Sequence, residues 1–186
     1  FRPSVLPHDD MTALVFKVRP RRAINVMIGP PADPKDDARV LKLFFAKEGS
    51  HICCGGSTAH MISRYLNKPI IPVEDSGTEK VPAIATIDGM DLVTEGIITL
   101  QQVADLAEQY VSDNRLSITI NSGNDGVSLL CAYLFEQATD INFFFGKAEN
   151  TANDDLDIGM DAKAIVINRL ISSLREMGKN VKISRC

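Results

Sequence analysis

The residues best suited to chemistry are Gly55, Gly56, Ser57 and Thr58, which follow the apolar run HICC at 51–54. A strand that ends in two glycines and then opens a helix suits an anion. The glycines let a ligand approach the backbone, and the first N–H groups and the dipole of the helix favour negative charge. The hydroxyls of Ser57 and Thr58 would add donors. The segment lacks both the GxGxxG pattern and the lysine of a phosphate-binding loop, so a tight turn with a helix cap and no ligand is the alternative.

A second loop would complete this site if the sheet is parallel. The segment DINFFFG at 140–146 is typical of a strand. The carboxyl ends of parallel strands share one edge, where open α/β sheets bind their ligands. We therefore expect Gly146, Lys147 and Asn150 to lie near the first loop, with Lys147 contributing a positive charge to a bound phosphate or carboxylate.

Histidines and cysteines near the first loop do not predict a metal site. On a strand, His51 and Cys53 share one face while Cys54 points to the other, and His60 lies in the helix beyond. We expect thiols that pack as small apolar groups. The chain has four cysteines and no CxxC pair, which indicates reduced thiols in a cytoplasmic protein rather than a disulfide framework.

Glu95 follows one strand end and precedes a helix. A carboxylate there would either bind a ligand or stabilise the helix start, and the second interpretation is the simpler one. The four aspartates between 154 and 161 lack the spacing of a calcium loop, so we expect solvated surface there.

Composition places the chain among globular proteins of ordinary size. Of its 186 residues, 45% are hydrophobic and 24% are charged, with a formal net charge of −4. This balance leaves no broad basic surface, so we expect no nucleic-acid partner. The apolar runs fall well short of the roughly 18 residues of a membrane span, and the first residues lack the apolar core of a signal peptide. We expect no membrane partner and a cytoplasmic location.

Alternating strands and helices predict an α/β fold, with a mixed, partly parallel sheet and helices packed on it. Strands are expected at 12–19, 23–29, 51–54, 70–73, 116–120, 140–146 and 181–184, with two short ones around the turn dipeptide Asp88-Gly89. Helices are expected after the N-cap Asp33, over 59–67, from the capping box that begins at Thr99, over 127–138 and over 161–178. The segment 127–138 is apolar almost all round, which predicts a buried helix, with a strand as the alternative.

The segment HDDMTALVFKV at 8–18 resembles the closing strand of metal-dependent serine/threonine phosphatases of the stage II sporulation protein E type. In that family an Asp-Asp-x-Thr element begins the last strand of the catalytic domain, and its first Asp is a metal ligand. Asp9 holds that place here, and the three residues after it fit the rest of the motif. The resemblance implies that Asp9 is a ligand of Mn²⁺ or Mg²⁺ in the intact phosphatase.

The remainder of the chain resembles the C-terminal extension of some bacterial phosphatases of this group. The segments that carry this likeness are IGPPADPKDDARVLKLFFAKEGSHICCGGSTAHMISRYL, DLVTEGIITL and DINFFFGKA. The resemblance implies two parts: residues 1–22 as the last strand of a catalytic domain, and residues 23–186 as an accessory α/β domain.

One departure from the family decides what this chain would do alone. The family's upstream Asp-Gly elements supply most ligands of two metal ions, which activate a water for attack on phosphoserine or phosphothreonine. Nothing ahead of His8 supplies them here, and Asp88-Gly89 and Asp125-Gly126 lie beyond the closing strand. We expect the intact protein to be a hydrolase acting on a phosphoprotein, and this chain to be inactive and without a metal of its own.

Two functions follow from these patterns. The first is a regulatory domain that binds a small anionic ligand at Gly55–Thr58 or packs against the catalytic domain. The second is a structural or dimerisation module, for which the apolar helix 127–138 and the apolar strands would form a homodimer interface. Three arrangements stay open for residues 1–19. The segment joins the sheet of the appended domain, pairs with another copy of the chain, or is poorly ordered before residue 8.

Overall fold

The computed structural model describes residues 12, 14, 16, 18–77, 82–112, 123–146 and 160–186, with side chains from 163 onward in the last range. Within these ranges a seven-stranded sheet has the order β3-β4-β5-β2-β1-β6-β7. Five neighbours in it run parallel: β5 (Leu92–Thr94), β2 (Ser50–Cys54), β1 (Ala23–Ile28), β6 (Asp140–Phe145) and β7 (Asn180–Arg185). The short strands β3 (Ile71–Pro72) and β4 (Ala85–Thr86) pair antiparallel at one end. The predicted mixed, partly parallel sheet is confirmed.

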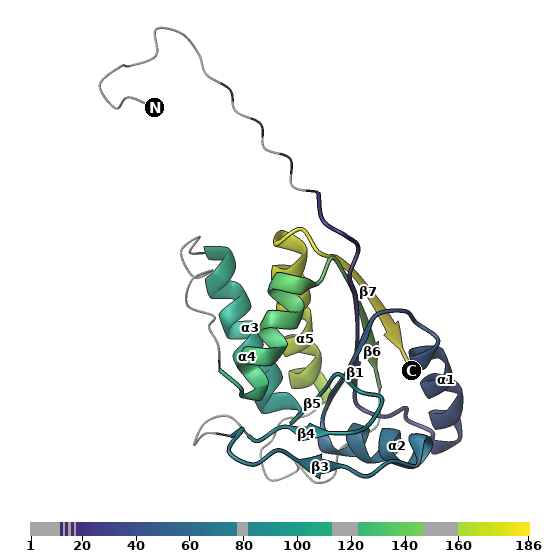
Figure 1. The fold of residues 1–186 in the computed structure, drawn as a ribbon. Coiled ribbons are helices and arrows are strands. Elements are labelled where there is room, and N and C mark those ends of the chain that lie inside the picture. Colours follow the sequence, from purple (N-terminus) through teal and green to yellow (C-terminus); the bar gives the residue numbers. More distant parts are fainter. Residues whose placement is uncertain are drawn as a thin grey trace, which may run out of the picture.

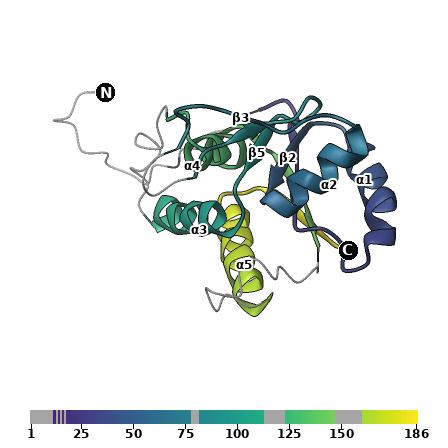
Figure 2. The same cartoon turned by 90° about the horizontal axis from the view of Figure 1, so that it is seen from below.

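Helices cover both faces of the sheet (Figures 1 and 2). A short 3-10 turn, η1 (Pro34–Asp36), leads into α1 (Asp37–Phe45), which shares one face with α2 (Gly56–Leu66). The other face carries α3 (Ile97–Ser112), α4 (Gly126–Cys131), the π-helix η3 (Ala132–Gln137) that continues α4, and α5 (Met160–Glu176). None of the helices in the described ranges is long and apolar enough to cross a membrane.

The strand β1 shows why its sequence is apolar at nearly every position. Met27 packs with α1 and α2, whereas Val26 and Ile28 belong to the core under α3, α4 and α5. A central parallel strand is buried on both faces, so it has no polar side to present. The exception is Asn25, which is fully buried but bonded: its amide donates to the carbonyl oxygens of Glu48 and Ser50 at 3.1 and 3.3 Å.

The order of the parallel strands defines a doubly wound sheet. Counted along the chain, the five parallel strands lie in the order third, second, first, fourth, fifth. The chain leaves β1 toward the α1 face and leaves β6 toward the α5 face, so β1 and β6 flank the point where the winding reverses. In open α/β sheets, ligands bind outside the carboxyl ends of the strands at such a point.

Two local predictions are wrong. The third helix begins at Ile97, not at Thr99, whose side chain is fully buried inside the first turn. At this helix start the carboxylate of Glu95 accepts a hydrogen bond from the backbone N–H of Ile98 at 3.3 Å, in agreement with the simpler interpretation of Glu95. The second wrong prediction is the strand at 12–19, whose described residues lie outside the sheet. The strand expected at 116–120 falls outside the described residues.

The segment 127–138 is helical as predicted. Its large apolar side chains, among them Val127, Leu130 and Leu134, are buried in the core of their own chain. The apolar character of this helix therefore reflects packing against α3, α5 and the sheet.

Candidate ligand site at the carboxyl edge of the sheet

Four strands end in glycine turns at one edge of the sheet. Gly29 follows β1, Gly55 follows β2, and Gly146 follows β6 directly; Gly96 comes two residues after β5. The turns touch in pairs. A Cβ built on Gly96 would lie 3.4 Å from the Cα of Gly55, and one built on Gly29 would lie 3.2 Å from the carbonyl oxygen of Gly146. The edge is therefore built from backbone, which a ligand can approach closely.

The start of α2 is the open part of this edge. Gly55 is its N-cap residue, with φ of 119°, and no side chain caps the helix. The first N–H groups of a helix have no acceptor inside it, so those of Gly56, Ser57 and Thr58 face outward. Gly56 and Ser57 are exposed, and a Cβ added to Gly56 would meet nothing within 4 Å. This geometry suits an anion, as the sequence predicts.

The helix α4 begins at the same edge but already holds a negative group. Gly126 packs against Thr94 of β5, and the carboxylate of Asp125 accepts hydrogen bonds from the N–H groups of Val127 and Ser128 at 2.9 and 3.0 Å. Partial burial works to raise the pKa of Asp125, but these bonds outweigh it and keep the pKa below its usual range. At this edge the starts of α3 and α4 thus each hold a carboxylate of their own, from Glu95 and Asp125, whereas the start of α2 has no such cap.

Thr58 belongs to the scaffold of the site. It is buried, and its hydroxyl accepts a hydrogen bond from the backbone N–H of Gly29 at 2.9 Å while lying 3.5 Å from the carbonyl oxygen of Cys54. The hydroxyl therefore ties the turn after β1 to the first turn of α2. Of the two predicted hydroxyl donors, Ser57 remains the one that faces solvent.

Replacing Thr58 by valine is expected to lower the free energy of unfolding by about 1–3 kcal/mol, because the shape is kept while the N–H of Gly29 loses its acceptor. Urea unfolding followed by circular dichroism measures the loss. Thr58→Ser keeps the oxygen and is the matched control, with most of the stability retained. Equal losses in both variants would contradict the role of the hydroxyl.

The second predicted loop lies at the same edge, but not beside the first. The N–H of Gly146 bonds to the carbonyl oxygen of Ile28 at 2.9 Å, so this turn adjoins the one after β1. Because β1 stands between β2 and β6, Gly146 is two strand spacings, roughly 10 Å, from the Gly55 turn. Lys147 and Asn150 lie outside the described residues, as does Asp9.

The thiols and possible metal ligands behave as packing groups. Cys53 and Cys54 are buried, and burial raises the pKa of the Cys54 thiol to about 12, so it is protonated at neutral pH. In the described part of the chain, no group of three or more His, Cys, Asp or Glu side chains is placed to hold a metal ion.

No protein-family model, curated protein or solved structure matches this chain in the comparisons made. The class of fold is defined by the topology itself: a doubly wound α/β domain with glycine turns along its carboxyl edge.

Proposed function

We propose that residues 23–186 form the accessory, regulatory domain of a metal-dependent serine/threonine phosphatase, and that the domain binds a small anionic ligand at Gly55–Thr58. The observation that carries the ligand proposal is the uncapped, exposed start of α2 beside the glycine turns of a doubly wound sheet. The phosphatase assignment rests on the resemblance of residues 8–18 to the closing catalytic strand.

The chemistry of the site favours a compact anion such as a phosphate or carboxylate group. Recognition would come from the backbone N–H groups of Gly56 and Ser57, the hydroxyl of Ser57 and the dipole of α2. Because Gly55 and Gly56 carry no Cβ, the anion could rest directly on the backbone. Lys147, the second residue after β6, would add positive charge only by reaching past the turn after β1, since β1 stands between β2 and β6. Binding there would stabilise the junction between β2 and α2.

Inorganic phosphate is the probe that tests the ligand site. Titration into ¹⁵N-labelled protein, against chloride at equal ionic strength, is expected to shift the amide signals of Gly56 and Ser57. Gly56→Leu should abolish the response without unfolding the chain, because the added side chain fills the open space before the helix. Ala38→Leu, at an exposed position on α1, is the matched control. An unchanged phosphate response in Gly56→Leu would remove the ligand proposal.

Hydrolysis of an aryl phosphate with Mn²⁺ tests the phosphatase assignment. The 186-residue chain is expected to show no turnover above its Asp9→Asn variant, since a two-metal centre needs more carboxylates than Asp9 provides. Turnover that disappears in Asp9→Asn would mean that this chain holds a complete metal site of its own. That result would overturn the accessory-domain proposal.

A further inference from the structure

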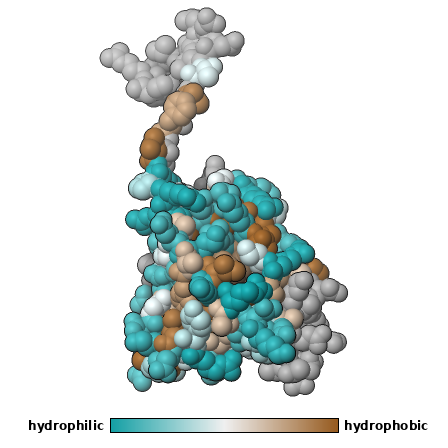
Figure 3. Space-filling view, turned by 90° about the vertical axis from the view of Figure 1, so that its right-hand side faces the viewer, coloured by the Kyte–Doolittle hydropathy of each residue, from teal (hydrophilic) through white to brown (hydrophobic). Residues whose placement is uncertain are grey.

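The described residues of the segment 12–18 present apolar side chains that the domain does not cover. Leu14, Phe16 and Val18 are 75%, 81% and 96% exposed. Their spacing of two residues places them on one face of an extended strand. Apolar residues of this segment, coloured brown, stand clear of the domain in Figure 3. Such a strand is a template for pairing with a sheet edge.

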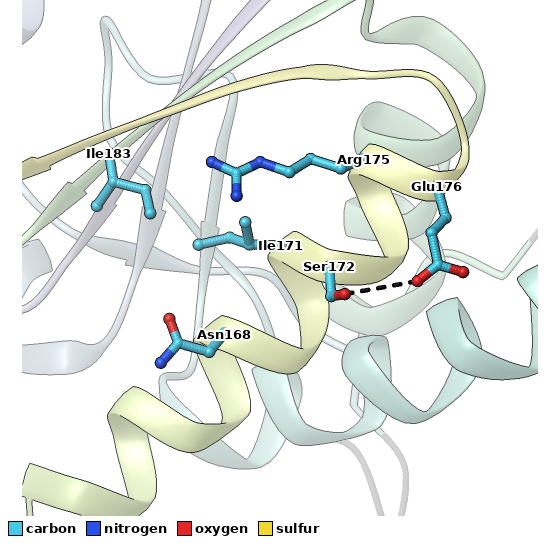
Figure 4. Close-up of a pocket in the computed structure, with 6 residues that line it drawn as sticks. All are labelled: Asn168, Ile171, Ser172, Arg175, Glu176 and Ile183. Carbon is cyan, nitrogen blue, oxygen red and sulfur yellow. Dashed lines mark hydrogen bonds between the residues drawn. The ribbon is translucent and has the colours of Figure 1, made fainter.

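The strand β7 offers an edge of the matching kind. It is the last strand of the sheet and pairs with β6 on one side, so among the described residues no strand bonds to its outer side. Next to it lies a hollow of about 500 Å³ between β7 and α5. Figure 4 shows Ile171, Arg175 and Ile183 converging on this hollow. Ile183 is 39% exposed there.

The residues after the apolar segment fix where it leaves the domain. The carbonyl oxygen of Arg22 accepts a hydrogen bond from the N–H of Thr139 at 2.9 Å. The guanidinium of Arg21 pairs with the carboxylate of Asp140 at 3.1 Å. Two independent contacts therefore hold the chain at the start of β6.

This exit lies beside the start of β7 but is directed away from the hollow of the same chain. Asp140 also accepts a hydrogen bond from the side chain of Asn180, the first residue of β7, at 2.9 Å. Arg19, however, turns toward η3, where it donates to the carbonyl oxygen of Glu136 at 3.4 Å. In Figure 1 the described residues ahead of β1 run outward from this point. While these contacts hold, the segment meets the β7 edge of another molecule more readily than its own.

We propose that two copies of this chain exchange residues 12–18, each adding the segment as an antiparallel strand to β7 of the other. With Phe16 opposite Ile183, the Phe16 ring would cover the hollow beside α5, because opposite residues of an antiparallel pair share a face. Leu14 and Val18 then lie on that same face. The exchange is independent of the anion site and goes beyond the accessory-domain function, since it needs only this chain.

Sedimentation equilibrium over a range of concentrations tests the exchange. We expect a mass approaching twice 20.3 kDa. Phe16→Asp and Ile183→Asp should each weaken the dimer at least about tenfold, because each replaces a buried apolar contact by a charge. Leu43→Asp, which changes a 53% exposed leucine on α1, is the control and should leave the dimer intact. Circular dichroism checks that each variant is folded.

Mixing the two disrupting variants distinguishes the exchange, in which the segment of one copy meets β7 of the other, from contacts between like elements of the two copies. A Phe16→Asp chain keeps an intact β7 edge, and an Ile183→Asp chain keeps an intact segment. The mixture should therefore form a heterodimer in which the intact segment pairs with the intact β7 edge, although neither variant dimerises alone. A monomeric parent chain at the highest soluble concentration, a dimer that survives Ile183→Asp, or a mixture that stays monomeric would each overturn the proposal.

Discussion

Replacing Gly146 by alanine should destabilise the domain by about 3 kcal/mol or more. A Cβ at this position would lie 2.0 Å from the carbonyl oxygen of Pro30 and 2.3 Å from that of Gly29. Both neighbours are backbone atoms, so neither can rotate away as a side chain would. Relief requires the turns after β1 and β6 to separate, and this breaks the hydrogen bond between the N–H of Gly146 and the carbonyl oxygen of Ile28.

Urea unfolding of Gly146→Ala beside Gly56→Ala measures this effect. Both variants add one methyl group to a glycine turn at the same edge, but a Cβ at Gly56 meets no atom within 4 Å. The control should gain up to about 1 kcal/mol, because alanine is the better helix former. A Gly146→Ala protein with the midpoint of the parent chain would show that the two turns do not meet as closely as described.

Local sequence patterns were enough to predict most elements of the fold. The largely apolar character of β1 marks a strand buried on both faces. Asp33 acts as the expected cap, accepting a hydrogen bond from the N–H of Lys35 at 2.9 Å. The turn dipeptide Asp88-Gly89 lies between β4 and β5, which pair antiparallel as expected. These features depend on residues that are close in the chain, and periodicity records such local preferences directly.

The parts of the site that escaped prediction depend on contacts between distant segments. Gly29 was not singled out, although a glycine directly after a buried strand was the available signal; its role depends on Gly146 and Thr58, which are far from it in sequence. Thr99 has the spacing of a capping box, yet Ile97 and Leu100 are buried in the core under α3, which sets the helix start earlier. Strand order likewise cannot be read from any single segment.

The π-helix η3 is a further feature that local pattern did not reveal. Its residues read as ordinary buried helix, and its end is held by Lys179, which lies some forty residues downstream. The ammonium group of Lys179 donates to the carbonyl oxygens of Phe135 and Ala138 at 2.5 and 2.8 Å. Widened helical turns leave backbone groups in need of partners, and here a distant side chain supplies them.

Replacing Lys179 by methionine should therefore cost about 2–3 kcal/mol of unfolding free energy, because the stem still packs while two carbonyl groups lose a charged donor. Urea unfolding measures the loss, and hydrogen exchange over 132–137 should show the largest gain in exchange rate. Lys182→Met, at an exposed position in β7, is the matched control and should stay within about 0.5 kcal/mol of the parent chain. Equal effects in the two variants would contradict a capping role for Lys179.

The pH dependence of stability gives Lys179 a second signature. Burial lowers its pKa below the usual lysine value, and the nearby charge of Arg19 lowers it further, while Glu136 acts in the opposite direction. Between the folded pKa and the higher unfolded pKa, the unfolded chain binds more protons, so stability rises with pH across that window. The parent chain should therefore gain stability relative to Lys179→Met as the pH rises from neutral toward the usual lysine value. Stability curves that stay parallel for the two proteins would contradict a net burial cost of the ammonium group in the folded state.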